Sequence, residues 1–310
     1  MDYKKISVLI VTYKQQDVIG RNIDSILQQK EFGLNEIVIC DDCSPDNNWG
    51  VIQEYVAKFP KIIRAYRNET NLGIYGNSNK LMSLRGDSDF YCWLEGDDAL
   101  CDGFFKAAQE FFNDRNLDTK EAIGVFSGYK SSSLVGEEIS YQNNYFEKYP
   151  KRNPFGAYSR GYVSWRSGLF TEKVLQRFEP ALLEQGLSLA EFLFDSQWFI
   201  HIDKAFYMPF ISSIYYTGIG VSTSLDETEY RRSEAEKQWQ YYIDNMAKNY
   251  FDMMWGKSKI IRAKYRMNKP KSIFGRMNCI LKYIYTSYLG MLPYGVNISR
   301  IKSGVYVMIR

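Results

Sequence analysis

Short apolar runs alternate with segments of helical period over the first 115 residues of the chain. The runs that predict β-strands are rich in β-branched or aromatic residues and lie at residues 6–12, 36–40, 61–66 and 90–94. The segments between them predict helices that begin near Asp17, Asn47 and Tyr75. Strands that alternate with helices are joined by right-handed crossovers, so the pattern predicts an α/β fold with a mostly parallel sheet of strand order 3-2-1-4. A fifth strand is expected at residues 122–129.

The fourth apolar run ends in an acidic turn, Glu95-Gly96-Asp97-Asp98. Three carboxylates within four residues repel one another and lose hydration at the edge of a buried strand, so a cation among their oxygens would stabilise them. Because hard divalent ions prefer carboxylate oxygens and often keep phosphate as a further ligand, we expect Asp97 and Asp98 to hold Mn²⁺ or Mg²⁺. The alternative is a solvated turn in which Asp98 or Asp102 caps the next helix. The position at a strand's carboxyl end favours ligand binding, because open α/β sheets bind ligands there.

The other three predicted strands also end in polar residues. Tyr13 follows the first, Asp42 follows the second, and the loop at residues 68–73 follows the third. The carboxyl ends of parallel strands share one edge of the sheet, where these residues are expected to gather with the acidic turn. The chain has neither a G-x-G-x-x-G pattern after the first strand nor a G-x-x-x-x-G-K-[ST] pattern. A metal at Asp97 and Asp98 would therefore replace a glycine cradle for phosphate groups.

The composition is that of a soluble globular protein, with 310 residues, 45% apolar and 24% charged. The N-terminal segment has no cleavable signal pattern, and no apolar stretch is long enough to span a membrane. Five cysteines without a scaffold spacing favour reduced thiols and a cytoplasmic location. Cys40 and Cys43 form a lone C-x-x-C pair, which disfavours a zinc site.

Charge is distributed unevenly along the chain. Residues 251–310 carry twelve Lys and Arg and one acid, a net charge of +11, whereas the rest carries 27 basic and 35 acidic side chains, a net charge of −8. Residues 257–310 interleave these cations with aromatic and aliphatic residues, and residues 277–292 are apolar enough to lie in a bilayer surface. We expect the basic segment to contact anionic headgroups. The side chains expected to do so are Lys257, Lys259, Arg262, Lys264 and Arg266. The alternative is a helical hairpin whose basic face is only solvated; nucleic acid is not expected, because no recognition motif accompanies the charge.

Four motifs in this order resemble the family-2 glycosyltransferases of the GT-A fold, which use nucleotide-sugar donors. They are residues 7–14 (SVLIVTYK), residues 39–44 (ICDDCS), Asn71-Leu72-Gly73 followed by Asn79, and residues 94–98 (LEGDD). The resemblance covers residues 5–115 and continues more faintly to about residue 225. It implies a catalytic domain at 1–225, with a nucleotide-sugar half at 1–115 and an acceptor half at 116–225, and a helical, basic extension at 226–310.

The resemblance also implies donor-binding roles, which carry over by position. Val11, Thr12 and Tyr13 would line the pocket for base and ribose, and Asp42 would accept a hydrogen bond from the imide N–H of uracil. Asn71 and Asn79 fall in the third motif and are assigned to donor binding.

The acidic turn occupies the place of the family's Asp-x-Asp motif. Glu95 and Asp97 stand at its two acidic positions, with Asp97 or Asp98 as the metal ligand, and the choice between the two stays open. Two positions depart from the family pattern. Glu95 replaces the commoner Asp, which lengthens its reach toward ribose or a metal-bound water. Ser78 stands where many relatives have an Arg before Asn79, which removes one expected phosphate contact.

Residues 188–203 predict a helix that carries Asp195 between Phe194 and Trp198. A carboxylate near apolar rings has its ionised form disfavoured, which raises its basicity, and the resemblance implies that Asp195 is the general base. The alternative is an exposed helix acid, and Glu191 is the reserve candidate.

The remaining features are weaker. His201, the only histidine, is expected to be structural, and no G-x-S-x-G elbow indicates a hydrolase. Residues 206–224 resemble the family's late strand and following loop, where Tyr216 and Ser222 would close over the pyrophosphate.

Together these features predict an inverting glycosyltransferase that moves a sugar from a nucleotide sugar, with a UDP-sugar favoured, to a hydroxyl of a glycan. The acceptor is expected to be lipid-linked surface polysaccharide, with the protein peripheral at the inner face of the cell membrane. Two alternatives stay open: a catalytically silent relative that binds glycan or nucleotide as a scaffold, and a sugar nucleotidyltransferase. The second normally carries a glycine-rich N-terminal loop, which this chain lacks.

Overall fold

A computed structural model describes residues 3–133, 136, 138–142, 144–166, 168–178, 191–217, 236–247, 249–294 and 296–309. The chain forms two compact units. Unit 1 consists of Met1–Pro154, Gly161–Pro180 and Gln197–Ser224, and unit 2 of Phe155–Arg160, Ala181–Ser196 and Leu225–Arg310. The division of the chain at residue 225 that the sequence suggests stays a prediction.

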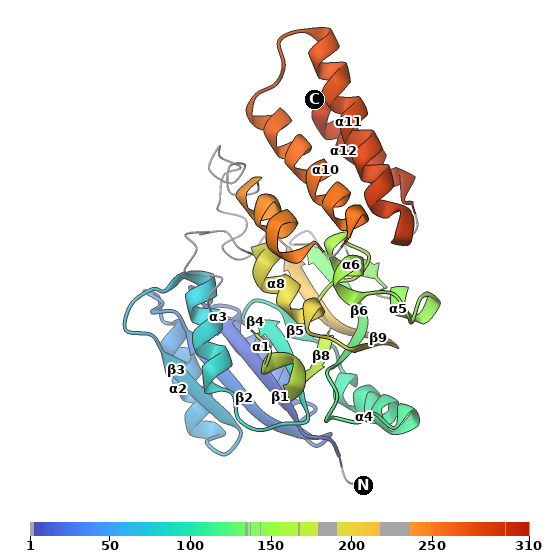
Figure 1. Ribbon diagram of the computed structural model, residues 1–310. Coiled ribbons are helices and arrows are strands. Elements are labelled where there is room, and N and C mark those ends of the chain that lie inside the picture. The colour runs from blue at the N-terminus through green and yellow to red at the C-terminus, as the bar shows by residue number, and fades with distance from the viewer. Residues whose placement is uncertain are drawn as a thin grey trace. The chain divides into compact units, whose positions relative to one another are not determined.

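The first half of unit 1 is the predicted four-stranded parallel array. Its strands are β1 (Ile6–Thr12), β2 (Leu34–Asp41), β3 (Ile63–Arg67) and β4 (Phe90–Glu95). They pair in the order β3-β2-β1-β4, and all three pairings are parallel, which confirms the predicted order (Figure 1). Every residue of β1 is buried, because this central strand is covered on both faces.

Four helices cover this array and form its core. They are α1 (Ile19–Leu27), α2 (Asn48–Lys58), α3 (Gly73–Leu84) and α4 (Phe104–Arg115). One apolar cluster joins α1 and α4 to the sheet through Ile23, Phe104 and Phe112, and the ring of Phe112 stacks on Phe90 at 4.0 Å between centroids. Helix α4 begins after Gly103, whose φ of 78° is left-handed, and its first turn is capped by Gln29, whose Oε1 accepts a hydrogen bond from Phe105 N at 3.1 Å. The alternative in which Asp98 or Asp102 caps this helix is therefore wrong.

The second half of the sheet adds strands of both directions. They are β5 (Ala99–Leu100), β6 (Ile123–Ser133), β7 (Glu138–Tyr141), β8 (Gly168–Thr171) and β9 (Lys204–Thr217). The sheet continues from β4 as β8-β6-β9-β5, with β7 paired to β6, and only the β6–β9 pairing is parallel among them. Strand β6 corresponds to the strand expected at 122–129, and β9 to the late strand expected, with its following loop, at 206–224; residues 218–224 lie outside the described residues. The two-residue strand β5 was not predicted, and its pairing with β9 shapes the acidic turn. Short helices α5 (Tyr145–Lys148) and α7 (Glu172–Leu175) complete this unit.

Helix α8 (Glu191–Ile200) crosses from unit 2 to unit 1 between Ser196 and Gln197. It confirms the helix predicted at 188–203 over its described part, since residues 188–190 lie outside the described residues. In unit 1, Trp198 of this helix is fully buried and packs edge-on against Trp93 of β4, 5.7 Å between ring centroids.

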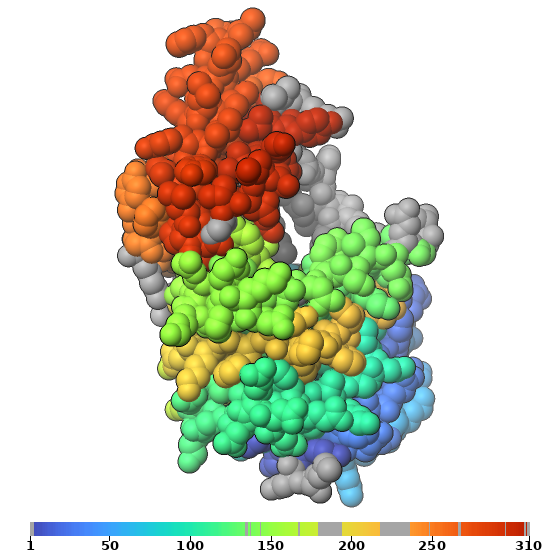
Figure 2. Space-filling view, turned by 90° about the vertical axis from the view of Figure 1, so that its right-hand side faces the viewer, coloured from blue at the N-terminus to red at the C-terminus, as the bar shows by residue number. Residues whose placement is uncertain are grey.

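Unit 2 is helical over its described residues, as expected for the basic extension. Its elements are α6 (Pro154–Ser159, from Phe155 on), η3 (Tyr242–Met246), α10 (Tyr250–Met267), α11 (Ile273–Met291), η4 (Leu292–Tyr294) and α12 (Ile298–Ile309). The side chains of Asn249 and Ser272 cap α10 and α11 by accepting hydrogen bonds from backbone N–H groups of their first turns. Figure 2 shows α10–α12, in orange and red, as one contiguous body.

A buried arginine ties these helices together. Arg160 has no exposed side-chain surface and donates to Asp252 of α10 at 2.9 Å and to the carbonyl oxygen of Gly290 of α11 at 2.6 Å. Its guanidinium also lies 4.0 Å from the ring centroid of Tyr294. A fully buried cation is stable only when paired and hydrogen-bonded, so these contacts fix the helices relative to one another within the unit.

Lys259 on α10 differs from its predicted role at lipid headgroups. Its Nζ lies 3.9 Å from the ring centroid of Trp255, inside the unit, and burial lowers the pKa of Lys259 well below its usual value. The assignment of this residue to headgroups is therefore wrong, because α10 turns it inward. Lys264 is exposed but pairs with Glu236 at 3.0 Å. Among the described helices, none combines the length and hydropathy needed to cross a bilayer.

Candidate functional site

The acidic turn leaves β4 at the carboxyl edge of the parallel strands, as predicted. Gly96 N donates to the carbonyl oxygen of Val11 at 3.0 Å, which brings the turn against the end of β1. A Cβ at Gly96 would lie 2.3 Å from Oε1 of Gln15 and 2.9 Å from Cβ of Thr12, so this close approach requires glycine. The side chain of Asn22 donates to the carbonyl oxygens of Glu95 and Asp98 and holds the turn from α1.

Arg166 supplies a cation inside the acidic cluster. Its Nη1 lies 2.9 Å from Oε2 of Glu95 and 3.3 Å from Oδ2 of Asp98. The guanidinium also lies 4.1 Å from the ring centroid of Tyr215, and only 19% of the side chain is exposed. The expectation that a cation stabilises these carboxylates is thus met partly by the chain itself. The sequence pattern did not point to Arg166, whose one signal is a single charge within the apolar and aromatic stretch at residues 162–170.

The structure separates Asp97 from Asp98, which the sequence left undecided. Both carboxylate oxygens of Asp98 are bound within the protein, because Oδ2 forms an ion pair with Arg166 and Oδ1 accepts a hydrogen bond from Tyr216 N at 3.3 Å. By contrast, no side chain among the described residues bonds to the carboxylate of Asp97. Burial and the nearby Glu95 raise the pKa of Asp97 to about 6, and the same two causes raise the pKa of Asp98 well above its usual range. With 8% and 4% of their surfaces exposed, neither residue belongs to a solvated turn.

A second arginine borders the turn from α1. Arg21 Nη2 donates to the carbonyl oxygen of Asp97 at 2.6 Å, and its guanidinium lies 3.6 Å from the ring centroid of Tyr216. Its buried Nε has no hydrogen-bond partner among the described residues. A buried donor without a partner is costly, so this atom is a candidate contact for an anionic ligand. Tyr216, expected near the pyrophosphate, therefore lies at the acidic turn, whereas Ser222 lies outside the described residues.

The donor set fits a divalent cation only in part. Within the described residues, no group of three or more His, Cys, Asp or Glu side chains could hold a metal ion. One uncommitted carboxylate, that of Asp97, is nevertheless what Mg²⁺ and similar ions use when substrate phosphates and water complete the coordination. The residues therefore fit a cation that binds together with a phosphate-bearing ligand, with Asp97 as its protein ligand.

Two adjacent acids at the end of β2, Asp41 and Asp42, also differ in how far their carboxylates are bound within the protein. Asp41 is fully buried and accepts hydrogen bonds from the side chain of Asn48 at 2.6 Å and from Ser44 N at 3.0 Å. Asp42 accepts from Asn68 Nδ2 at 2.9 Å and from Leu72 N at 2.8 Å, both at Oδ1. Since no donor among the described residues reaches its Oδ2, Asp42 keeps one acceptor for a ligand. Asp41 instead stabilises the loop that follows β2.

The remaining expected donor-binding residues lie along the same parallel strands. Val11 and Thr12 are buried at the end of β1, and Thr12 Oγ1 accepts a hydrogen bond from Asn48 at 3.1 Å. Tyr13 is half-buried, with Lys14 Nζ 5.1 Å from its ring centroid. Asn71 is exposed, and its Oδ1 accepts from Gly73 N at 2.9 Å, which turns the loop into α3. Their contacts with a donor stay predictions, as does that of Asn79, which is half-buried on α3.

The expected general base belongs to unit 2, whereas the acidic turn belongs to unit 1. Asp195 is half-buried on α8, and Tyr158 of α6 donates from its hydroxyl to Oδ2 at 3.1 Å. Sequence reasoning missed Tyr158, which is 37 residues away. The side chain of Glu191, the reserve candidate, is outside the described set. The structural role of His201 stays a prediction.

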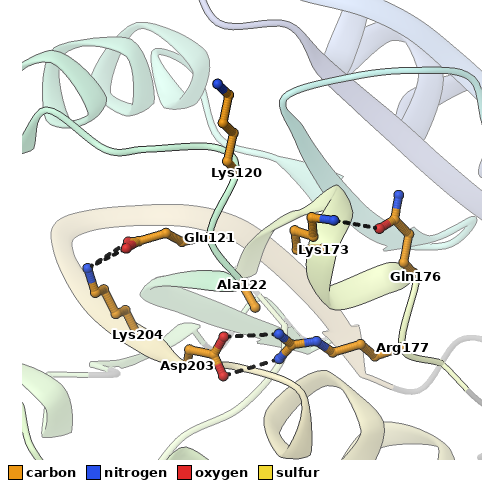
Figure 3. A pocket seen from close by; sticks show the side chains of 8 residues that line it. All are labelled: Lys120, Glu121, Ala122, Lys173, Gln176, Arg177, Asp203 and Lys204. Atoms are coloured by element: carbon orange, nitrogen blue, oxygen red, sulfur yellow. Dashed lines mark hydrogen bonds and ion pairs between the residues drawn. The ribbon is translucent and has the colours of Figure 1, made fainter.

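A separate pocket of about 420 Å³ opens at the opposite edge of the sheet (Figure 3). It lies beside the end of β8, whose Thr171 pairs with the first residue of β4. Four of its charged side chains form ion pairs: Arg177 pairs with Asp203 at 3.1 Å and Lys204 with Glu121 at 2.6 Å. Because these charges are already paired, we do not assign the donor site to this pocket.

The family model described as "Glycosyl transferase family 2" matches residues 7–163, just over half of the chain. The chain belongs to glycosyl transferase family 2. The matched segment contains β1–β4 and the acidic turn, so the resemblance inferred from the four motifs is confirmed.

Relatives of this family-2 chain match a little over a third of it. Uncharacterized protein Rv1520 of Mycobacterium tuberculosis is 30% identical over 115 residues, which cover 37% of this chain and 33% of that protein. The processive diacylglycerol beta-glycosyltransferase of Mycoplasma pneumoniae is 26% identical over 117 residues, covering 37% and 34%. The chain thus spans about a third of the length of these curated relatives.

A solved structure confirms the GT-A fold of the family-2 chain. It is residues 1–349 of Staphylococcus aureus TarS in complex with UDP-GlcNAc, with a TM-score of 0.57 over 98% of this chain and 89% of that one. The two sequences are 13% identical over this alignment, so the similarity concerns the fold.

Proposed function

We propose that this family-2 protein transfers a sugar from a nucleotide-sugar donor, with a UDP-sugar favoured, to a hydroxyl group of a glycan. The observation that carries the proposal is the buried carboxylate of Asp97, which no side chain of the described residues binds, beside the Arg166-bound acids at the carboxyl edge of β4. A family-2 chain with these polar residues at the carboxyl ends of its parallel strands can bind a nucleoside diphosphate there. The TarS structure of the same fold is a complex with UDP-GlcNAc, which supports the choice of UDP.

In this proposal the donor lies along the ends of β1, β2 and β4. Val11, Thr12 and Tyr13 line the base and ribose, and Oδ2 of Asp42 accepts the imide N–H of uracil. Asn71, Asn79 and Glu95 complete the contacts to the sugar nucleotide. A divalent ion bound at Asp97 would supply charge neutralisation for the diphosphate. With its carboxylate already bound to Arg166, Asp98 holds the turn rather than the ion.

Asp195 is the proposed general base of an inverting displacement. Its carboxylate takes the proton of the acceptor hydroxyl while that oxygen bonds to the anomeric carbon from the face opposite the diphosphate. The bond between the anomeric carbon and the diphosphate oxygen breaks, and the nucleoside diphosphate leaves with the electron pair. Tyr158 donates a hydrogen bond to Oδ2 of Asp195 at 3.1 Å, which orients the carboxylate.

We further propose that the acceptor is a glycan or lipid-linked oligosaccharide at the inner face of the cell membrane. Two observations support a lipid-linked acceptor. The relative from Mycoplasma pneumoniae is named for transfer to diacylglycerol, and the C-terminal helices of this chain carry a net charge of +11 over residues 251–310.

The decisive experiment measures acceptor-dependent release of UDP by the wild type and by Asp195→Asn. Loss of the base is expected to lower kcat by about 10²–10⁴ while leaving the KM for the donor nearly unchanged. Asp203→Asn, in an exposed ion pair at the opposite edge of the sheet, is the matched control and should retain full activity. Full turnover by Asp195→Asn would refute its role as the base.

A panel of nucleotide sugars, with and without Mn²⁺, tests donor binding separately, because a ligand that binds only the folded state raises the unfolding temperature. Binding without turnover in any acceptor mixture would favour the silent scaffold. Release of pyrophosphate instead of UDP would favour a nucleotidyltransferase.

A further inference from the structure

The outer face of α11 exposes a continuous row of large apolar side chains. The row, called here the α11 stripe, follows helical spacing and consists of Phe274, Met277, Leu281, Tyr285, Tyr288 and, one residue past the helix, Leu292. Their exposed fractions run from 42% for Leu292 to 82% for Phe274. The opposite face of the helix, with Tyr283, Ser287 and Gly290, is buried against the rest of unit 2. The core of this unit therefore does not need the stripe.

The stripe is long and convex. Eighteen residues separate its ends, which corresponds to about 27 Å along a helix at 1.5 Å per residue. Exposed apolar patches of this extent mark interaction surfaces, whereas single exposed apolar residues do not. Side chains that project from a ridge suit a deformable, extended surface better than a ligand pocket.

The charges around the stripe have one sign. No Asp or Glu occurs after Asp252, so α11, α12 and nearly all of α10 contain only basic charges. Lys271, Arg276 and Lys282, before and on α11, are exposed. A second copy docked stripe to stripe would bring these like charges together, which is unfavourable. An anionic partner is favoured instead.

An amphipathic helix with an apolar face, flanking Lys and Arg, and aromatic residues with polar tips is the pattern of a helix that lies in a lipid interface. Tyr285 and Tyr288 provide such tips, and the length and hydropathy of α11 do not suffice for spanning. We infer that the α11 stripe is the surface by which this protein inserts into an anionic lipid membrane, lying in the interface with its cations at the headgroups. The inference rests on the membrane association proposed above but not on the donor site or on Asp195.

Vesicle flotation of the full chain tests this inference. The vesicles contain either phosphatidylcholine alone or phosphatidylcholine with phosphatidylglycerol. The wild type should float with the anionic vesicles and bind the neutral ones much more weakly. The double variant Phe274→Ser and Leu281→Ser should bind anionic vesicles roughly tenfold more weakly or worse, because it removes two apolar side chains from the inserted face.

Matched variants separate the apolar and the charged contributions. Ile139→Ser removes an apolar side chain that is 55% exposed on β7 of unit 1 and should leave vesicle binding unchanged. Arg276→Ser and Lys282→Ser should each weaken binding to anionic vesicles on the order of fivefold, and this loss should vanish at high salt. Circular dichroism and UDP binding, measured on every variant, report whether the fold and the donor site are intact.

Three outcomes would overturn the inference. The first is wild type that floats with neither kind of vesicle, and the second is a stripe variant that binds as the wild type does. The third is a concentration-dependent dimer in sedimentation experiments that the stripe substitutions abolish, which would identify the stripe as a contact between copies. If UDP-sugar turnover persists while vesicle binding fails, this inference alone is wrong and the proposed transferase chemistry stands.

Discussion

Replacement of Arg166 by Met should destabilise the protein, and the loss should grow as the pH rises. Met keeps much of the length and apolar volume of the arginine stem but removes the guanidinium. In the wild type that group lies 2.9 Å from Glu95 and 3.3 Å from Asp98. The variant therefore leaves two carboxylates, and Asp97 beside them, without their nearest cation.

The size of the effect follows from how far these groups are buried. Removing one partner of a fully buried ion pair costs about 3–5 kcal/mol. Asp98 is nearly fully buried at 6% side-chain exposure, but Arg166 and Glu95 are exposed by 19% and 24%, so water screens part of the interaction. For Arg166→Met we therefore expect the free energy of unfolding at neutral pH to fall by about 3 kcal/mol, near the lower end of that range. This figure includes the lost contact with the ring of Tyr215.

The pH dependence has a defined sign. Burial raises the pKa of Asp97 from 3.8 to about 6 and also raises that of Asp98, whereas Arg166 opposes both shifts. A carboxyl group with a raised pKa in the folded state contributes stability below its unfolded pKa and loses it as the pH rises through the folded value. Without Arg166 these shifts become larger, so the variant falls further below the wild type from about pH 4 upward through pH 6.

Urea unfolding at about pH 5 and about pH 8 measures this difference, since ΔG is linear in denaturant. Arg177→Met is the control, because Arg177 pairs with Asp203 at a site where both side chains are more than 40% exposed. This substitution should lower the free energy of unfolding by no more than about 0.5 kcal/mol. The loss of unfolding free energy in Arg166→Lys should lie between those of Arg166→Met and Arg177→Met, because lysine keeps the positive charge but not the planar guanidinium. Equal losses for Arg166→Met at both pH values, or a loss no larger than that of Arg177→Met, would refute the reasoning.

Three further predictions concern the two units separately. Asp97→Asn should abolish the increase in unfolding temperature that Mn²⁺ produces in the presence of UDP, whereas Asp98→Asn should retain part of it; the opposite ranking in a thermal-shift titration would contradict the assignment of the ligand. Wild-type stability should fall by up to about 3 kcal/mol between pH 4 and pH 6, because the pKa of Asp97 is raised to about 6, and a flat pH profile from chemical denaturation in that window would exclude the shift. Arg160→Met should cost unit 2 about 3–5 kcal/mol because it removes the cation that pairs with the buried carboxylate of Asp252, and limited proteolysis of α10–α12 at a wild-type rate would show that the pair is dispensable.

The local pattern of apolar residues was sufficient to predict the parallel half of the sheet. Strands β1–β4 and helices α1–α3 appear where the periodicity places them, because each buries a continuous run or one face against its neighbours. The order 3-2-1-4 followed from right-handed crossovers together with the strand order of doubly wound α/β folds. The position of the acidic turn at the carboxyl edge was equally determined, since the turn directly follows a strand of that sheet.

Residues distant in sequence decided the chemistry of that turn. Arg166 reaches Glu95 across 71 positions, and Tyr216 reaches Asp98 across 118, through β-strands whose pairing no local pattern encodes. Adjacent residues such as Asp97 and Asp98 have nearly the same local context, so their sequence does not distinguish them. Only the tertiary contacts show that the carboxylate of Asp98 is bound within the protein, whereas no side chain of the described residues binds that of Asp97.

The C-terminal helices show the same division. Composition alone determined that residues 251–310 are basic and rich in apolar side chains. Both faces of α11 carry apolar residues, however, so the sequence does not show which face is buried. The packing of Trp255 against Gly290 and of Tyr283 against Gly304 decides it, because a Cβ at either glycine would collide with the neighbouring helix. That close contact buries one face of α11 and leaves the row from Phe274 to Leu292 exposed.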